Sequence, residues 1–277
     1  MNIKIINSIA MQELLSVIRS RWVMIFSVVF AVIALTISFA GTKISGFTGF
    51  QDFIRTTASL LNLNLYLVPL VALILGAMSF ASDEPGALQL QISQPVLRSE
   101  NLLGKYFGLF LAIVISTGIG FGAAGMVIGW RAGASDLTAY IAFVLLSLVL
   151  GLIFLSISAL ISVITMKRTQ ALSIGLFVWF IFVILYDLLV MWLASSFEGN
   201  VLRNVLFGML FGNPVDLVRV GTLFVLGGKI MFGPTAGAVL KFVGGTGSGF
   251  LVLFTALLAW GGLPLALAIK IFSNKDL

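Results

Sequence analysis

The feature that most constrains this chain is a series of long stretches without charged residues. Six such stretches, one interrupted only by Asp187, reach about 20 residues or more, the length at which an α-helix crosses a bilayer. Helices also satisfy every backbone N–H and C=O group internally, as hydrocarbon requires. We therefore expect an all-α integral membrane protein, one transmembrane domain of residues 1–277, with six spans at about 22–42, 58–80, 106–130, 139–164, 171–193 and 249–269.

The composition excludes several other classes of protein. Residues are 60% hydrophobic and 9% charged, whereas soluble domains contain roughly 25% charged residues. The net charge of +6 comes from basic residues scattered between apolar stretches, so it does not indicate nucleic-acid binding. The chain has no cysteine and no histidine, and so lacks the usual ligands of copper and zinc. We expect no catalytic, cofactor-binding or metal-binding residues.

The distribution of Lys and Arg predicts the orientation. An even number of spans places both termini on one side, which carries nine of the 16 basic residues, close to the span ends. The positive-inside rule then predicts a multi-pass membrane protein with both termini in the cytoplasm. Residues 4–20 show an apolar stripe at helical spacing, which predicts an amphipathic helix lying in the membrane interface.

The stretch 198–248 is mostly apolar but carries a charge about every dozen residues. Asn213-Pro214 is typical of a helix start, with a capping residue followed by proline. We expect two or three short re-entrant or interfacial helices that enter the outer leaflet or lie on it. A seventh span is the alternative, and it would have to bury a charge.

Asp187 is the only ionisable residue well inside a predicted span. Such residues are costly in lipid and are by default functional candidates, with Arg55 or Lys43 as partner. In the other interpretation, the span ends early and Asp187 lies at the interface. Glycine pairs at 104/108, 118/122 and 125/129 are typical of close helix packing.

The loop 83–105 is the longest on the predicted cytoplasmic side. Pro85 suits the first turn of a short helix, with Asp83 and Glu84 at its positive end. The alternation of apolar residues and glutamine at 88–92 would also suit a strand.

Pro95 is expected to end this first element. Ser99 is then predicted to cap a second helix, with Glu100 in its first turn, that runs into the third span. A compact turn of this kind is either a docking site or a simple connection, and its residues alone do not decide between them.

The order of residues in this loop resembles that of the ABC-2 type permeases, in particular those of transporters that mature nitrous-oxide reductase. In that group an acidic pair and a glycine precede a leucine-rich helix, followed by QPV, a basic residue and LLGK. The matching residues here are Asp83, Glu84, Gly86, Gln94-Pro95-Val96, Arg98 and Leu102-Leu103-Gly104-Lys105.

The resemblance extends along the whole chain. Weaker matches are Tyr186-Asp187-Leu188, Asn213-Pro214-Val215-Asp216 and Phe232-Gly233-Pro234. One departure is Pro85-Gly86-Ala87, where the family more often has a polar residue and then Gly-Thr. The start of the coupling helix is therefore left open.

The resemblance implies a homodimeric permease in the lipid of the bacterial inner membrane, with six helices from each copy. The loop 83–105 would carry a coupling helix that docks on a cytoplasmic ATPase subunit, and a periplasmic partner would sit on the segment 198–248. The implied ATPase-coupling residues are Asp83, Glu84, Gly86, Gln94, Pro95 and Arg98. The sequence contains no G-x-x-x-x-G-K-[ST] phosphate loop, so ATP and magnesium would be bound by the partner.

Other functions are less well supported by these residues. An intramembrane enzyme needs converging nucleophiles, acids or metal ligands, and the spans offer Asp187 with a few serines and threonines. A channel or secondary transporter needs a polar path through the membrane. The cargo is not readable: a sulfur species, copper, mechanical work on a partner, and a lipid or other small hydrophobic molecule all remain open.

Overall fold

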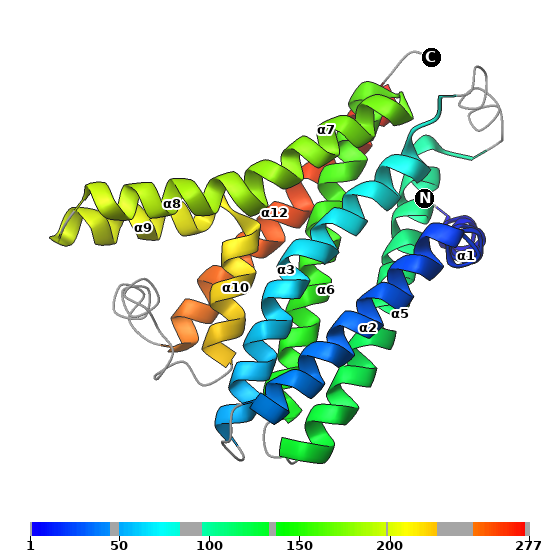
Figure 1. The fold of residues 1–277 in the computed structure, drawn as a ribbon. Helices are drawn as coiled ribbons and strands as arrows, with labels where there is room; N and C mark the ends of the chain where they lie inside the picture. The colour runs from blue at the N-terminus through cyan, green and yellow to red at the C-terminus, as the bar shows by residue number, and fades with distance from the viewer. Residues whose placement is uncertain are drawn as a thin grey trace.

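The computed structural model describes residues 2–44, 50–83, 96–132, 137–197, 199–225 and 246–274, and all regular structure in these ranges is helical (Figure 1). The predicted all-α class is confirmed. The elements in chain order are α1 (Ile3–Ile18), α2 (Arg21–Ile44), α3 (Phe50–Phe80), α5 (Arg98–Ala132), α6 (Leu137–Thr165), α7 (Arg168–Phe180), the π-helix η2 (Ile181–Leu185), α8 (Tyr186–Ser196), α9 (Gly199–Gly212), α10 (Pro214–Val225) and α12 (Thr246–Asn274).

Five helical segments of the described chain are long and apolar enough to cross a membrane. A sixth crossing is counted when α1 and α2, which meet at an angle of 68°, are taken together. Five or six spans therefore fit the structure, and the count of six stays a prediction. The five segments are Thr56–Phe80, Arg98–Trp130, Leu137–Thr165, Arg168–Ser196 and Leu251–Asn274.

Helix α6 forms the centre of the bundle, and α3, α5, α7, α10 and α12 pack around it. It is the most apolar of the described helices, and its side chains at Phe143, Leu150 and Phe154 are fully buried. Small residues allow close contacts: the Ser158 hydroxyl donates to the Leu73 carbonyl of α3 at 2.9 Å, and Gly76 lies directly against Ser158.

The continuous helix made by α7, η2 and α8 lies mostly outside this core. Figure 1 shows it running along the top of the view and leaving the bundle, with α9 returning beside α8. Only 11% of the most apolar part of Arg168–Ser196 is buried. Large apolar side chains such as Phe177, Leu188 and Trp192 are therefore left exposed on its surface.

Two predicted helix starts can be compared with the structure. The start at Asn213-Pro214 is confirmed, because α10 begins at Pro214 and the Asn213 side chain caps it. The start at Ser99 is wrong, because α5 already begins at Arg98, and the Leu97 carbonyl accepts from the Asn101 N–H. Glu100 does lie in the first turn, as expected.

Candidate functional site

Two regions contain the residues that the sequence singled out. The first is the end of the bundle where α3 stops at Phe80 and α5 starts at Arg98, which we call the Asp83 end. The structure places Asp83 and Arg98 at the two roots of the predicted coupling loop. The other predicted coupling residues, Glu84, Gly86, Gln94 and Pro95, lie outside the described residues.

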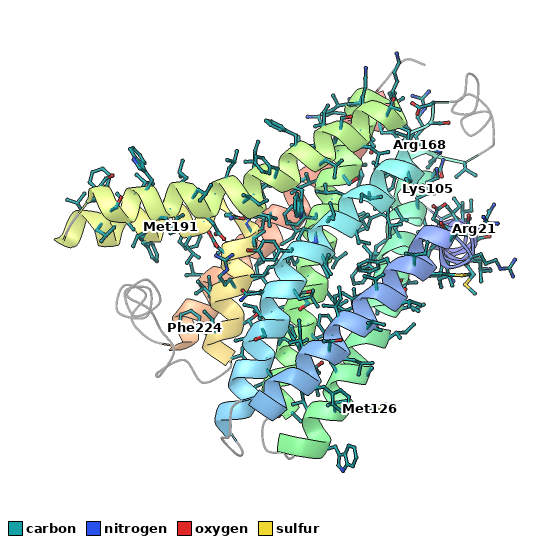
Figure 2. All side chains as sticks on the ribbon, viewed as in Figure 1. Arg21, Lys105, Met126, Arg168, Met191 and Phe224 are labelled. Carbon is teal, nitrogen blue, oxygen red and sulfur yellow. The ribbon has the colours of Figure 1, made fainter. Side chains whose placement is uncertain are left out.

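The two roots of the loop are held by polar contacts with neighbouring helices. The Asp83 carboxylate accepts from the backbone N–H and from the hydroxyl of Thr169, each at 3.3 Å, which links the end of α3 to the start of α7. The Lys105 ammonium of α5 donates to the Ser79 carbonyl of α3 at 2.9 Å. Figure 2 shows Lys105 and Arg168, which begins α7, near each other at this end.

Helix α1 packs against the same two roots. A Cβ at Gly104 would lie 2.6 Å from the Ile9 Cβ, and a Cβ at Gly108 would lie 2.5 Å from the Ala10 carbonyl oxygen. The predicted glycine pair at 104/108 therefore does bring two helices close together. The Ser79 hydroxyl also donates to the Glu13 carboxylate of α1 at 2.7 Å, so α1 is fastened to both α3 and α5.

The other glycine pairs behave differently. A Cβ at Gly125 would meet the Tyr140 ring at 2.8 Å. Gly118, Gly122 and Gly129 have nothing within 4 Å of such a Cβ. The spacing of small residues therefore identified helix contacts at Gly104, Gly108 and Gly125, and not at the other three positions.

The second region is formed around Asp187 in the first turn of α8. The two terminal nitrogens of Arg219 on α10 donate to the two Asp187 carboxylate oxygens, at 2.9 and 3.0 Å. Arg219 also binds the Asp216 carboxylate at 2.8 Å, so two carboxylates share one guanidinium. The side chains of Arg219, Asp187 and Asp216 are 29%, 32% and 13% exposed.

This partner differs from the predicted ones. We expected Arg55 or Lys43, whose side chains lie outside the described residues, and the structure instead pairs Asp187 with Arg219. The sequence did contain a signal for Arg219: it follows Asp216 by three positions, the spacing of a helical ion pair. The helix continues for nine residues beyond Asp187 to Ser196, and the position of the membrane boundary along it stays a prediction.

A π-helix lies directly before Asp187, and Asn213 contacts it. The Asn213 amide donates to the Phe182 carbonyl of η2 at 2.8 Å, while its oxygen accepts from the Val215 N–H at 2.9 Å. Single-turn π-helices leave carbonyls without their usual partner and often occur at functional sites. The single side chain of Asn213 thus caps α10 and also provides a hydrogen-bond donor for a carbonyl of η2.

Two further contacts complete this region. The Tyr186 hydroxyl donates to the Met209 carbonyl of α9, and Gly212 leaves the space in which that hydroxyl lies. The Trp260 indole N–H of α12 donates to the Phe211 carbonyl at 3.0 Å. Residues 186–188 and 213–216, the two weaker sequence matches, therefore lie close together where the start of α8 packs near the turn between α9 and α10.

The chemistry of these contacts favours holding helices in place. Arg219 binds Asp187 and Asp216 at the same time, so neither carboxylate is presented as an acid or base to a substrate. The Arg219–Asp187 pair is bidentate, and bidentate pairs are directional, so this contact favours one arrangement of α8 relative to α10. The region can act as an electrostatic latch between α8 and α10, which we call the Arg219 latch.

Comparison with known proteins gives a consistent result over the whole chain. Residues 7–277 match the model of the ABC-2 family transporter proteins. A protein of Stutzerimonas stutzeri named "Probable ABC transporter permease protein NosY" is 34% identical over 275 residues, covering 97% of this chain and 98% of the relative. A protein of the same name from Pseudomonas aeruginosa is 32% identical over 275 residues, covering 98% of each.

Proposed function

The chain belongs to the ABC-2 family of transporter proteins, and on that premise we propose that it couples ATP hydrolysis by a separate ATPase subunit to work across the inner membrane. The observation that carries the proposal is the match to transporter permeases along nearly the full length of the chain. The sequence has no phosphate-binding loop of its own, which is consistent with ATP and magnesium being bound by a partner.

The loop 83–105 is the proposed docking element for that ATPase. Its roots are fastened to α7 through Asp83 and to α3 through Lys105, and α1 is packed onto the same place. A force applied to the loop would therefore act on α1, α3, α5 and α7 together, which is the requirement for coupling. The proposed contacts with the ATPase come from Glu84, Gln94 and Arg98.

A second copy of the chain is the proposed partner within the membrane. The helix formed by α7, η2 and α8 presents large apolar side chains on a surface that the rest of the described chain does not cover. In a homodimer, this surface would have a protein partner in addition to lipid. Both termini and the loop would then face the cytoplasm in each copy, with the segment 198–248 on the periplasmic side.

The names of the two relatives support a narrower proposal, a role in the maturation of nitrous-oxide reductase. The ATPase partner would be NosF-like and the periplasmic partner NosD-like. The absence of cysteine and histidine argues against copper passing through this subunit by ligand exchange. The proposed cargo is a sulfur species for the copper–sulfur cluster, or mechanical work on the periplasmic partner.

The alternative is an ABC-2 exporter permease for a lipid or another small hydrophobic molecule. The two proposals are separated by reconstituting the chain with its ATPase and adding candidate substrates one at a time. A sulfur species that stimulates hydrolysis would favour the maturation role. Stimulation by lipids alone would favour the exporter.

Charge reversal in the loop tests the coupling proposal. We expect Glu84→Lys combined with Arg98→Glu to abolish the stimulation of ATPase activity and complementation in cells, because contacts with the ATPase would become repulsive. Expression and thermal unfolding should remain close to those of the wild type.

The matched control is Lys270→Glu, which reverses an exposed charge on α12 at the same end of the bundle. We expect this variant to retain stimulated ATPase activity. If the double variant also retained stimulation and complementation, the loop would not be the coupling element.

A further inference from the structure

A layer of polar side chains lies inside the bundle, where α3, α5 and α6 meet. It consists of Asn64 on α3, Thr117 on α5 and Ser147 on α6, and we call it the Asn64 layer. The three residues are 0%, 1% and 1% exposed. They come from three helices that are long and apolar enough to cross the membrane.

The contacts of Gly151 show that these residues lie at one depth. A Cβ at Gly151 would meet Val68 of α3 at 3.2 Å and Ile113 of α5 at 3.3 Å, so the three helices meet there. Asn64 precedes Val68 by four residues, Ser147 precedes Gly151 by four, and Thr117 follows Ile113 by four. Because α5 runs opposite to α3 and α6, all three displacements point toward the same end of the bundle, and residues four apart share a helix face.

An aromatic contact one helical turn beyond the layer supports this alignment of α5 with α6. Phe121 of α5 and Phe143 of α6 are again four residues on, and their rings pack edge to face with centroids 5.2 Å apart. The Asn64 layer is therefore enclosed between these two rings on one side and the contact at Gly151 on the other. Both rings are buried, at 2% and 0% exposure.

The hydrogen bonds of the layer are incomplete. Among the described residues, neither the nitrogen nor the oxygen of the Asn64 amide has a hydrogen-bond partner. The Thr117 hydroxyl donates to the Ile113 carbonyl at 2.7 Å, and the Ser147 hydroxyl donates to the Phe143 carbonyl at 2.8 Å. Each hydroxyl oxygen still has lone pairs that can accept. The layer thus offers two N–H donors and several acceptors around Asn64.

A neighbouring helix contributes another such group at this depth. Gly221 of α10 lies against α6, since a Cβ at this position would be 3.6 Å from a terminal carbon of Leu146. The next residue on α10, Thr222, is fully buried, and its hydroxyl also has no hydrogen-bond partner in the described part of the chain. Buried polar groups in native proteins are nearly always hydrogen-bonded, so the unpaired groups of Asn64 and Thr222 require an explanation.

We propose that the Asn64 layer is an internal water-binding site. A water molecule can accept from the Asn64 amide N–H and donate to the oxygens of Thr117 and Ser147, which gives it the two to four polar partners that a buried water needs. None of the three side chains is charged, so the site suits a neutral molecule and not an ion. Water bound here satisfies the amide that the protein leaves unpaired.

Radiolytic labelling of the full-length chain in lipid nanodiscs tests this site. Brief X-ray exposure of water generates hydroxyl radicals that modify the nearest side chains, and ¹⁸O-labelled water marks the product. We expect Phe121 and Phe143 to be labelled several-fold more than Phe154, which is equally buried on α6 but two to three turns away. Asn64→Leu should reduce the labelling of both rings to the level of Phe154. Equal labelling of the three rings in the wild type would overturn the proposal.

A matched pair of valine variants gives a second, independent measurement. Thr117 and Thr255 both donate to the carbonyl four residues earlier at 2.7 Å, but Thr255 is exposed on α12. We expect Thr117→Val to lower the melting temperature by at least about 2 °C because a water ligand is lost, and Thr255→Val to leave it unchanged. If Thr117→Val matched or exceeded the stability of Thr255→Val, the layer would be dry and the proposal wrong.

Discussion

Replacing Arg219 with leucine is expected to lower the free energy of unfolding by about 1–3 kcal/mol. The substitution leaves Asp187 and Asp216 with no guanidinium between them, at carboxylates that are 32% and 13% exposed. Protein does not bury either carboxylate completely, so the larger cost of a fully buried unpaired charge is not expected. Denaturant unfolding of the purified chain, followed by the fluorescence of its tryptophans, measures the change.

A double-mutant cycle separates the ion pair from other effects of the substitution. Arg219→Leu, Asp187→Asn and the double variant should show that the two single losses are not additive, because both remove the same bidentate contact. Additive losses would mean that the Arg219 latch does not hold α8 against α10.

The same variants distinguish a functional latch from a structural one. Asp187→Asn keeps the shape of the side chain and removes its charge. If transport were unchanged at unchanged expression, Asp187 would have no functional role and the latch would serve stability alone. Loss of transport with normal folding would show that the α8–α10 contact takes part in the transport cycle.

Adding one methyl group at Gly108 is expected to destabilise the protein by about 1–3 kcal/mol. The Cβ of Gly108→Ala would lie 2.5 Å from the Ala10 carbonyl oxygen and 2.8 Å from the Glu13 Cβ, both on α1. Because the first of these atoms belongs to the backbone, α1 must move away from α5 to make room. Thermal unfolding and protease sensitivity of α1 would measure this displacement.

Gly122→Ala on the same helix is the control, and the expected sign is opposite. Nothing lies within 4 Å of a Cβ at Gly122, and alanine favours a helix over glycine by up to about 1 kcal/mol. The control should therefore be neutral or slightly more stable than the wild type. Equal behaviour of the two variants would contradict the close packing of α1 on α5.

The features predicted correctly from the sequence depend on local chemistry. Apolar stretches of spanning length form helices, because the backbone must satisfy its own hydrogen bonds in hydrocarbon. The start of α10 follows from the capping side chain of Asn213 and the ring of Pro214. The close approach of α1 to α5 follows from the absence of side chains at Gly104 and Gly108. Each of these can be recognised within a few consecutive residues.

The features that were missed depend on how distant segments fold back. Asp187 and Arg219 are 32 positions apart, and they meet only because α9 returns beside α8 and places α10 against it. The π-helix at Ile181–Leu185 leaves no pattern in a uniformly apolar stretch, and its partner Asn213 lies 31 positions from Phe182. The Asn64 layer likewise requires the register of three helices.

The coupling residues remain predictions, and they carry the central claim. Glu84, Gly86, Gln94 and Pro95 were assigned from the resemblance of the loop 83–105 to transporter permeases, and they lie outside the described residues. What the structure describes is the attachment of the loop roots to neighbouring helices, through Asp83 and Lys105.

Site-specific cross-linking tests that claim most directly, because the chain has no cysteine of its own. A benzophenone maleimide attached to Gln94→Cys, in the complex with its ATPase, is expected to form an adduct with the ATPase on illumination. The same reagent at Thr138→Cys, exposed at the start of α6 at the opposite end of the bundle, should form none. An adduct at residue 138, or none at residue 94, would contradict the account.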